Sequence, residues 1–218
     1  MRQRFELIVF DWDGTLMDSA ALIVASVQAA ARDLGLTPPP AERARHIIGL
    51  GLGEALRHAL PELPEAHYPA LVARYRHHYL SRDHELELFE GVRDLVRDLA
   101  ERGYRLGVAT GKSRVGLDRA LAHTGLGAYF HATRCADECH SKPHPQMLLE
   151  LMDACEVSPD KTLMIGDTTH DLEMAQNAGV PAVAVSYGAH PRDALAGAMP
   201  LYCAASVADL AAWLQCNG

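Results

Sequence analysis

Two aspartates, Asp11 and Asp13, directly follow the apolar run of residues 7–10, and Gly14 comes immediately after them. A short, uninterrupted apolar run is typical of a strand buried on both faces of a parallel sheet, and the glycine predicts a turn that ends it. Open α/β sheets bind their ligands at the carboxyl ends of their strands. We therefore expect an α/β protein with a site at Asp11 and Asp13, where two carboxylates favour a bound cation.

After residue 91 the apolar pattern alternates between the strand period and the helix period. Further strands are predicted at 105–109, 129–133, 162–165 and 182–185. Helices are predicted at 92–101, 114–123, 146–155 and 171–178. Alternating strands and helices predict a doubly wound parallel sheet, a Rossmann-like core with right-handed crossovers.

A long stretch between the first strand and this alternation carries helical spacing only. Apolar residues recur every three or four positions from Leu16 to Leu34 and stop at Gly35, and more helices are predicted at 41–48, 54–60 and 69–80. We expect residues 16–85 to form a small all-helical domain inserted into a core made of residues 1–15 and 86–218.

Polar residues follow three of the later apolar segments in an ordered series. They are Thr110 with Gly111, then Lys142, then Asp167 with Asp171. Together with Asp11-x-Asp13-Gly14-Thr15, the series resembles the four motifs of the haloacid dehalogenase superfamily. Nearly the whole chain is similar to the phosphoglycolate phosphatase-like branch of that superfamily. The resemblance implies a Rossmann-like catalytic core, a helical cap at residues 16–85, and hydrolysis of a small phosphate monoester.

The resemblance also implies roles for the carboxylates. Asp11 is the expected nucleophile, which forms an aspartyl-phosphate that water then hydrolyses. Asp13 is the expected general acid and base, protonating the leaving alkoxide and later deprotonating the water. Mg²⁺ suits an oxygen-only ligand set, and its expected ligands are Asp11, the backbone carbonyl of Asp13, and Asp167.

Four further residues complete the expected site. Thr110, the backbone amide of Gly111 and Lys142 are expected to bind phosphate. Asp171 lies one helical turn after Asp167, where it could hold a metal-bound water, orient Lys142, or simply be a solvated acid in the first turn of a helix, favoured by the helix dipole. The sequence leaves these three alternatives for Asp171 open.

Several features of residues 16–85 bear on the substrate. We interpret the glycine-rich loop at residues 49–53 as facing the active site, and we interpret the histidines from His46 to His84 as a polar helix face rather than a metal site. Candidates for binding a second negative group on the substrate are Arg43, Arg45, Arg57, Arg74 and Arg76.

Other functions fit the sequence less well. A phosphomutase would share the nucleophile and the acid, but Thr15 matches the phosphatase pattern of the superfamily. A non-catalytic binding protein is disfavoured because the motif residues are all present. Gly111-Lys112-Ser113 resembles the end of a nucleotide-binding P-loop, but Leu106 occupies the position of the required upstream glycine, which excludes that motif.

Composition limits the partners. The chain has 218 residues, and 20 Lys and Arg against 28 Asp and Glu give a formal charge of -8, which argues against non-specific nucleic-acid binding. The first apolar run is too short for a signal peptide or a membrane span, and five cysteines, an odd number, do not indicate a disulfide framework. We expect a soluble cytoplasmic enzyme that acts on a phosphorylated metabolite. The sequence does not indicate the oligomeric state.

Overall fold

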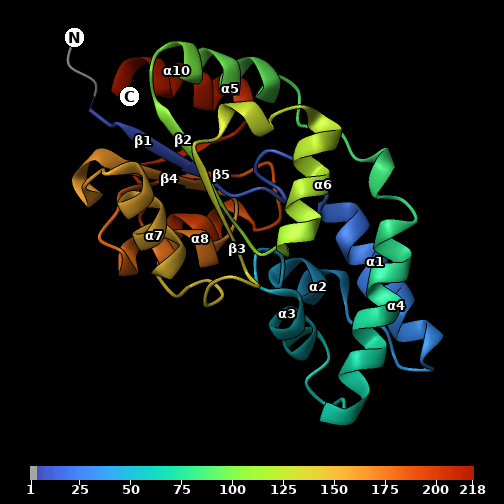
Figure 1. Ribbon diagram of the computed structural model, residues 1–218. Coiled ribbons are helices and arrows are strands. Elements are labelled where there is room, and N and C mark those ends of the chain that lie inside the picture. The colour runs from blue at the N-terminus through green and yellow to red at the C-terminus, as the bar shows by residue number, and fades with distance from the viewer. Residues whose placement is uncertain (1–3) are drawn as a thin grey trace.

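A six-stranded parallel sheet forms the centre of the computed structural model, which describes residues 4–218 (Figure 1). Its strand order is β3-β2-β1-β4-β5-β6. The strands are β1 (Leu7–Phe10), β2 (Arg105–Thr110), β3 (Ala132–Cys135), β4 (Thr162–Gly166), β5 (Ala182–Val185) and β6 (Tyr202–Ala204). The predicted Rossmann-like α/β fold is confirmed.

Alternate residues of β1 face two different helical layers. Ile8 and Phe10 belong to an apolar cluster that includes side chains of α5, α6 and α10, whereas Leu7 and Val9 pack with side chains of α7 and α8. Figure 1 shows α5 and α10 on one side of the sheet and α7 and α8 on the other. Because both faces are covered, β1 is apolar throughout.

The core contains six α-helices among the described residues. They are α5 (Val92–Glu101), α6 (Arg114–Thr124), α7 (Gln146–Cys155), α8 (Thr169–Asn177), α9 (Arg192–Gly197) and α10 (Val207–Asn217), with short 3₁₀ turns at Gly127–Tyr129 and Pro159–Lys161. Hydroxyl side chains fix the start of three of them. Ser113, Thr168 and Ser206 each accept a hydrogen bond from a backbone N–H in the first turn of α6, α8 and α10.

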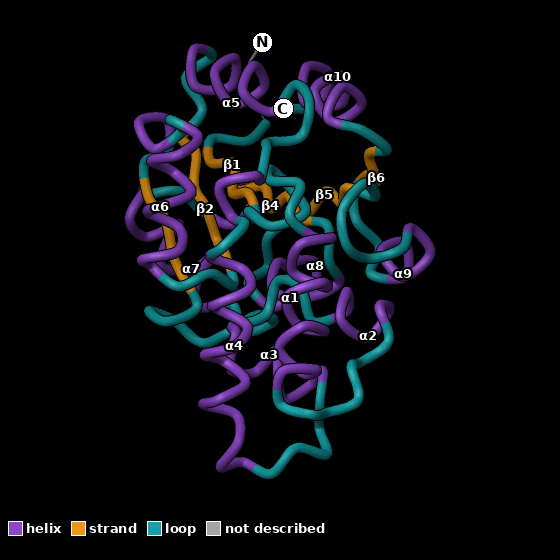
Figure 2. Tube along the Cα trace, turned by 90° about the vertical axis from the view of Figure 1, so that its right-hand side faces the viewer, coloured by secondary structure: helices purple, strands orange, loops and turns teal. Residues whose placement is uncertain are grey.

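Residues 16–85, which we call the helical insertion, contain no strand. The insertion holds α1 (Ala20–Asp33), α2 (Ala41–His46), α3 (Leu52–Ala59) and α4 (Tyr68–Leu80), with 3₁₀ turns at Glu65–His67 and Asp83–Glu85. These helices share an apolar cluster separate from the core clusters, with Val27, Leu56 and Leu71 among its most buried members. Figure 2 shows α3 and α4 projecting below the sheet.

Two neighbouring chain segments connect the insertion to the core. The Asp18 amide donates to the Glu87 carbonyl at 3.0 Å, and the Phe89 amide donates to the Leu16 carbonyl at 3.0 Å. Met17 forms an isolated antiparallel bridge with Leu88. The chain therefore leaves and re-enters the core at a single place, through a short hydrogen-bonded ribbon.

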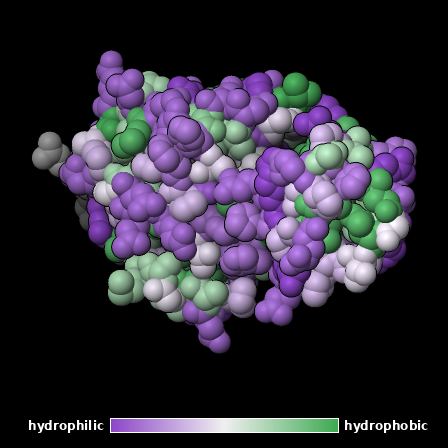
Figure 3. Space-filling model, turned by 90° about the horizontal axis from the view of Figure 1, so that it is seen from below, coloured by the Kyte–Doolittle hydropathy of each residue, from purple (hydrophilic) through white to green (hydrophobic). Residues whose placement is uncertain are grey.

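Exposed large apolar side chains are scattered over the surface. Among the described residues they are Leu80, Val115, Leu149, Met199 and Leu201. Figure 3 shows the apolar residues of one face as separate patches on a mainly hydrophilic surface. In the described part of the chain, no helix is both long and apolar enough to cross a membrane, and all five cysteines are free thiols.

The structure corrects the sequence prediction at one strand. Residues 129–133 were predicted as a strand, but Gly127–Tyr129 form a 3₁₀ turn and β3 begins at Ala132. The Leu126 carbonyl accepts a hydrogen bond from the Tyr129 amide, so the chain is still turning at the first residue of the predicted strand. The pattern also gave no prediction for α9, β6 and α10, which complete the sheet edge and one helical layer.

Candidate active site

Three central strands end at the same edge of the sheet and place polar residues there. Asp11 follows β1, Thr110 ends β2 and Asp167 follows β4, and all three are fully buried. The Asp11 amide donates to the carbonyl of Ile165 in β4 at 2.9 Å, which fixes the position of Asp11 relative to that strand. The expected site residues are therefore brought together by the parallel pairing of strands distant in sequence.

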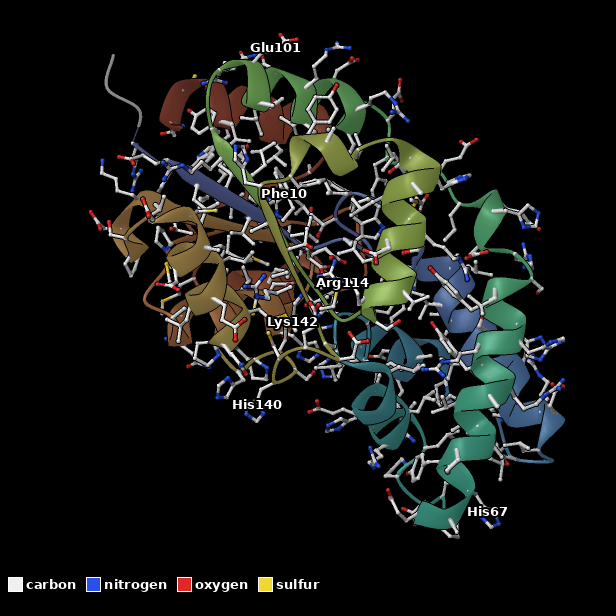
Figure 4. All side chains as sticks on the ribbon, in the orientation of Figure 1. Phe10, His67, Glu101, Arg114, His140 and Lys142 are labelled. Atoms are coloured by element: carbon white, nitrogen blue, oxygen red, sulfur yellow. The ribbon has the colours of Figure 1, made fainter. Side chains whose placement is uncertain are left out.

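Lys142 joins this cluster from the loop before α7. Its Nζ lies 2.6 Å from Asp11 Oδ1 and 2.6 Å from Asp171 Oδ1, and all three side chains are fully buried. Figure 4 shows Lys142 between the sheet and the helical insertion, far from Glu101 at one end of the molecule and His67 at the other. A buried ammonium needs such partners because an unpaired charge inside a protein is costly.

Asp171 orients Lys142, which is one of the alternatives that the sequence left open, and because it is fully buried it is not a solvated acid. Its Oδ1 accepts from Lys142, while its Oδ2 accepts from the Thr168 amide at 3.1 Å and from Thr168 Oγ1 at 2.7 Å. The Thr168 side chain in turn accepts from the Asp171 amide, which completes a capping box at the start of α8. Asp171 therefore caps the helix and orients Lys142 at the same time.

The electrostatics of the cluster create a need for further positive charge. Burial raises the pKa of Asp11 well above its ordinary value, the Lys142 charge opposes that rise, and the Asp171 carboxylate adds to it. Burial, followed by the charge of Asp171, raises the pKa of Asp167 to about 7. Burial alone would lower the pKa of Lys142, but Asp11 and Asp171 outweigh burial and raise it above its ordinary value.

The donor set fits a hard divalent cation. Carboxylate oxygens of Asp11, Asp167 and Asp171 lie within 4.8 Å of one another. Asp11 Oδ2 is buried and has no hydrogen-bond partner. Asp167 is held by Thr15 Oγ1 at 2.8 Å and by the Ala189 amide at 2.7 Å. An orphaned carboxylate oxygen among oxygen-only donors is the environment that Mg²⁺ prefers.

Asp13 has partners different from those of Asp11. Ser19 Oγ donates to Asp13 Oδ1 at 2.6 Å, and Lys112 Nζ lies 3.0 Å from Asp13 Oδ2. Lys112 also donates to the hydroxyl of Tyr79, on α4 of the insertion, at 2.9 Å. Burial lowers the pKa of Lys112, but the Asp13 carboxylate and the contact with the Tyr79 hydroxyl outweigh burial and raise it.

Sequence reasoning missed Lys112 as a site residue. It was considered only as part of a P-loop, which the chain lacks. Two signals could have identified it: the chain has just three lysines, and Lys112 lies two residues after Thr110, which ends β2 at the edge where the site forms.

The glycine-rich loop of the insertion lies against the strand-end residues, as the sequence predicts. The Gly51 amide donates to Ser141 Oγ at 2.9 Å, next to Lys142. A Cβ at Gly111 would lie 2.6 Å from the Gly49 carbonyl oxygen and still closer to that of Leu50. Gly111 is therefore required for the loop to approach the core this closely.

We expect Gly111→Ala to reduce kcat/KM by about 10²-fold, because its Cβ displaces the 49–53 loop while its backbone amide stays available to phosphate. Gly197→Ala is the matched control, since a Cβ there meets nothing within 4 Å. Steady-state kinetics of both variants on one phosphate ester test this expectation. Equal activity of the two variants would show that the close approach does not matter.

A cavity of about 770 Å³ separates the helical insertion from the core. Its polar lining includes Asp13, Tyr75, Arg76, Tyr79 and Lys112. Of the five arginines that the sequence offers as candidates, all of which lie in the described part of the chain, Arg76 alone lines this cavity. Two of the other four form ion pairs elsewhere in the insertion, Arg57 with Glu65 and Arg74 with Asp33.

Three histidines meet where α2 contacts the core. Ring nitrogens of His46, His170 and His190 lie within 4.8 Å of one another. The Thr169 amide donates to His190 Nδ1 at 3.1 Å, which places the proton of the neutral ring on Nε2. His190 Nε2 and His170 Nε2 then donate to the same His46 carbonyl, at 3.1 and 2.8 Å.

These histidine contacts refine the sequence interpretation of His46. His46 is exposed on α2, as a polar helix face requires, and its ring also stacks on His190 with centroids 4.9 Å apart. Nε2 of His170 and Nε2 of His190 each carry the proton that they donate, so neither atom has a lone pair that could bind a metal. The cluster bonds the end of α2 to the core.

The chain is similar to a hydrolase family and to several phosphatases. A family model described as haloacid dehalogenase-like hydrolase matches residues 8–185. "Probable phosphatase IndB" of Dickeya dadantii is 36% identical over 200 residues, covering 89% of this chain and 86% of that protein. "Pyrophosphatase PpaX" of Bacillus cereus is 29% identical over 211 residues, covering 95% of each. The crystal structure of a predicted phosphatase from Clostridium acetobutylicum has a TM-score of 0.85 and 25% identity, covering 97% of this chain and 98% of that chain.

Proposed function

Because this chain belongs to the haloacid dehalogenase-like hydrolase family, we propose that it is a Mg²⁺-dependent phosphatase that works through an aspartyl-phosphate. It is a phosphoric monoester hydrolase. The proposed substrates are small phosphorylated metabolites, with phosphoglycolate as the first compound to test. The observation that carries the proposal is Asp11: a buried carboxylate with one oxygen held by Lys142 and the other without a partner.

The proposed reaction has two steps. A carboxylate oxygen of Asp11 attacks phosphorus, the bond from phosphorus to the ester oxygen breaks, and Asp13 gives its proton to the departing alkoxide. Asp13 then takes a proton from the water that attacks the aspartyl-phosphate, which releases phosphate and restores both carboxyl groups. Lys142 keeps Asp11 oriented throughout, through the contact of 2.6 Å.

Phosphate and metal are assigned to the remaining residues. Thr110, the Gly111 amide and Lys142 would bind phosphate oxygens. Asp11, the Asp13 carbonyl and Asp167 would hold Mg²⁺, which, when bound, offsets the negative charge gathered by the carboxylates and the phosphate. Asp171 acts on the site through Lys142 rather than by touching the substrate.

We further propose that residues 16–85 are a movable cap on a core of residues 1–15 and 86–218. The hydrogen-bonded ribbon at residues 16–19 and 86–91 is the proposed hinge. Two observations support this division: the insertion has an apolar cluster of its own, and its loop lies over Gly111. Closure would exclude bulk water from the reaction, and opening would release product.

Hydrolysis of p-nitrophenyl phosphate with and without Mg²⁺ tests the proposed function. We expect activity that chelation by EDTA removes and added Mg²⁺ restores. A panel containing phosphoglycolate, pyrophosphate and sugar phosphates, compared by kcat/KM, then identifies the substrate class. Isomerisation of a sugar phosphate without phosphate release would instead indicate a phosphomutase, and no turnover of any member would favour a binding protein.

Replacement of Asp13 separates metal binding from proton transfer. Asp13→Asn keeps the backbone carbonyl but removes the acid, so we expect kcat to fall by about 10²- to 10⁴-fold while Mg²⁺ binds with nearly unchanged affinity. Isothermal titration with Mg²⁺ beside the kinetics measures both quantities. Parallel loss of metal affinity and kcat would contradict the division of roles proposed for Asp13.

A further inference from the structure

Lys112 forms a direct connection between the catalytic core and the helical insertion. We propose that Lys112 is a positioning residue that couples closure of the insertion to the orientation of Asp13. The inference rests on the proposed function, in which Asp13 protonates the leaving group. Lys112 itself is not required to touch the substrate for this role.

The two oxygens of Asp13 are held by two different groups. Ser19 Oγ fixes Oδ1 at 2.6 Å, and Lys112 Nζ fixes Oδ2 at 3.0 Å. A carboxylate held at both oxygens has a defined plane and a defined lone-pair direction. Without Lys112, the Ser19 contact alone would leave the carboxylate free to rotate about its bond to Cβ, which weakens proton transfer to a fixed ester oxygen.

Lys112 is in turn held from both sides of the cavity. Its backbone amide donates to Thr110 Oγ1 at 3.2 Å, which fixes the start of the side chain on the core. Its ammonium donates to Tyr79 Oη at 2.9 Å, and Tyr79 stacks on Tyr75 with centroids 5.7 Å apart, both on α4 of the insertion. Only 11% of the Lys112 side chain is exposed, so its contacts are mainly with protein groups.

The Tyr79 contact makes the arrangement depend on closure. Movement of α4 away from the core removes the phenol oxygen and admits water to the ammonium, so the observed geometry of Lys112 requires the insertion to be in place. Lys112 therefore keeps both its Asp13 contact and its Tyr79 contact only while the insertion encloses the leaving group.

The test uses phenyl phosphates that share one shape but differ in the basicity of the phenolate that leaves. A less basic phenolate needs less protonation, so a defect in Asp13 positioning must grow with leaving-group basicity. The measured quantity is kcat/KM, which reports the step that breaks the ester bond. Tyr79→Phe removes only the hydroxyl, and Lys161→Met is the control for loss of a lysine elsewhere.

We expect Lys112→Met to lower kcat/KM by about ten- to a hundredfold on phenyl phosphate but by less than about threefold on p-nitrophenyl phosphate. Tyr79→Phe should lower kcat/KM on phenyl phosphate by about three- to tenfold, which is the size of one lost hydrogen bond. The loss should again be smaller on p-nitrophenyl phosphate. The double variant should be no worse than Lys112→Met alone, because both changes act through one contact chain. Lys161→Met should resemble the wild type on every ester.

Two kinetic outcomes would overturn this inference while leaving the proposed function intact. An equal loss of kcat/KM on all esters would assign Lys112 a structural or substrate-binding role, and additive effects of the two changes would separate Lys112 from the insertion. Absence of Asp11-dependent hydrolysis in the wild type would instead refute the proposed function, and this inference with it. A thermal melt of each variant identifies any loss of folded protein.

Discussion

Asp11→Asn is expected to abolish turnover, lowering kcat by at least about 10⁴-fold, because an amide of nearly the same shape does not attack phosphorus. The same change should not lower thermal stability. Burial disfavours the ionised form of Asp11 more than the Lys142 charge favours it, and Lys142 keeps its contact with Asp171 when Asp11 becomes neutral. The measurements are steady-state kinetics with Mg²⁺ and a thermal melt without it.

The matched control for Asp11 is Asp153→Asn, an exposed aspartate on α7 outside the site. It should retain wild-type activity and stability. Turnover by Asp11→Asn within tenfold of the wild type would remove Asp11 from the nucleophile role. A collapse of its melting temperature would instead show that the lost activity reflects unfolding.

Lys142→Met is expected to damage both activity and folding. The ammonium lies 2.6 Å from each of two fully buried carboxylates, and Asp167 adds a third acid close by. Removing one partner of a buried ion pair typically costs about 3–5 kcal/mol of stability, because the other charge is left uncompensated. Urea denaturation measures this loss in the free energy of unfolding, and kinetics on the folded variant measure the loss of phosphate binding.

Lys161→Met provides the comparison for Lys142, since Lys161 lies in an exposed 3₁₀ turn and its Nζ contacts only the Arg4 carbonyl among the hydrogen bonds described. We expect Lys161→Met to lower the free energy of unfolding by less than about 0.5 kcal/mol. We also expect Mg²⁺ to recover part of the stability of Lys142→Met, because a bound cation offsets the same carboxylates. A Lys142→Met variant as stable as the wild type would contradict the proposed balance of charge.

Much of the fold followed from local pattern. The apolar run of β1 and its two aspartates predicted a buried strand and a site at its end, because parallel strands place their carboxyl ends together. The start of β3 was misplaced because the aromatic residues Tyr129 and Phe130 suggested a strand where the chain makes a tight turn. Of the elements after residue 185, α9 and β6 are short, whereas Val207, Leu210 and Leu214 of α10 lie at a helical spacing that could have predicted it.

The site was predictable where it depends on strand ends and less so where it depends on packing. The residue types at Asp11, Thr110 and Asp167, and their order along the chain, indicated that these three residues lie close together. The contact of Lys112 with Tyr79 spans 33 residues and depends on how α4 lies against the core, which no local pattern determines. Asp171 stayed ambiguous because its two oxygens serve different partners, a distinction visible only in three dimensions.

The hydrogen-bonded ribbon between residues 16–19 and 86–91 also bears on how the chain assembles. β1 and β2 pair side by side although the entire insertion lies between them in sequence. Closing a flexible loop costs about 0.6 kcal/mol more for each doubling of its length. A folded insertion with joined ends shortens the loop between β1 and β2 to roughly a third of its length, which lowers this entropic cost by about 1 kcal/mol. An insertion that folds early on its own apolar cluster would thus bring the first two central strands together and favour rapid formation of the sheet.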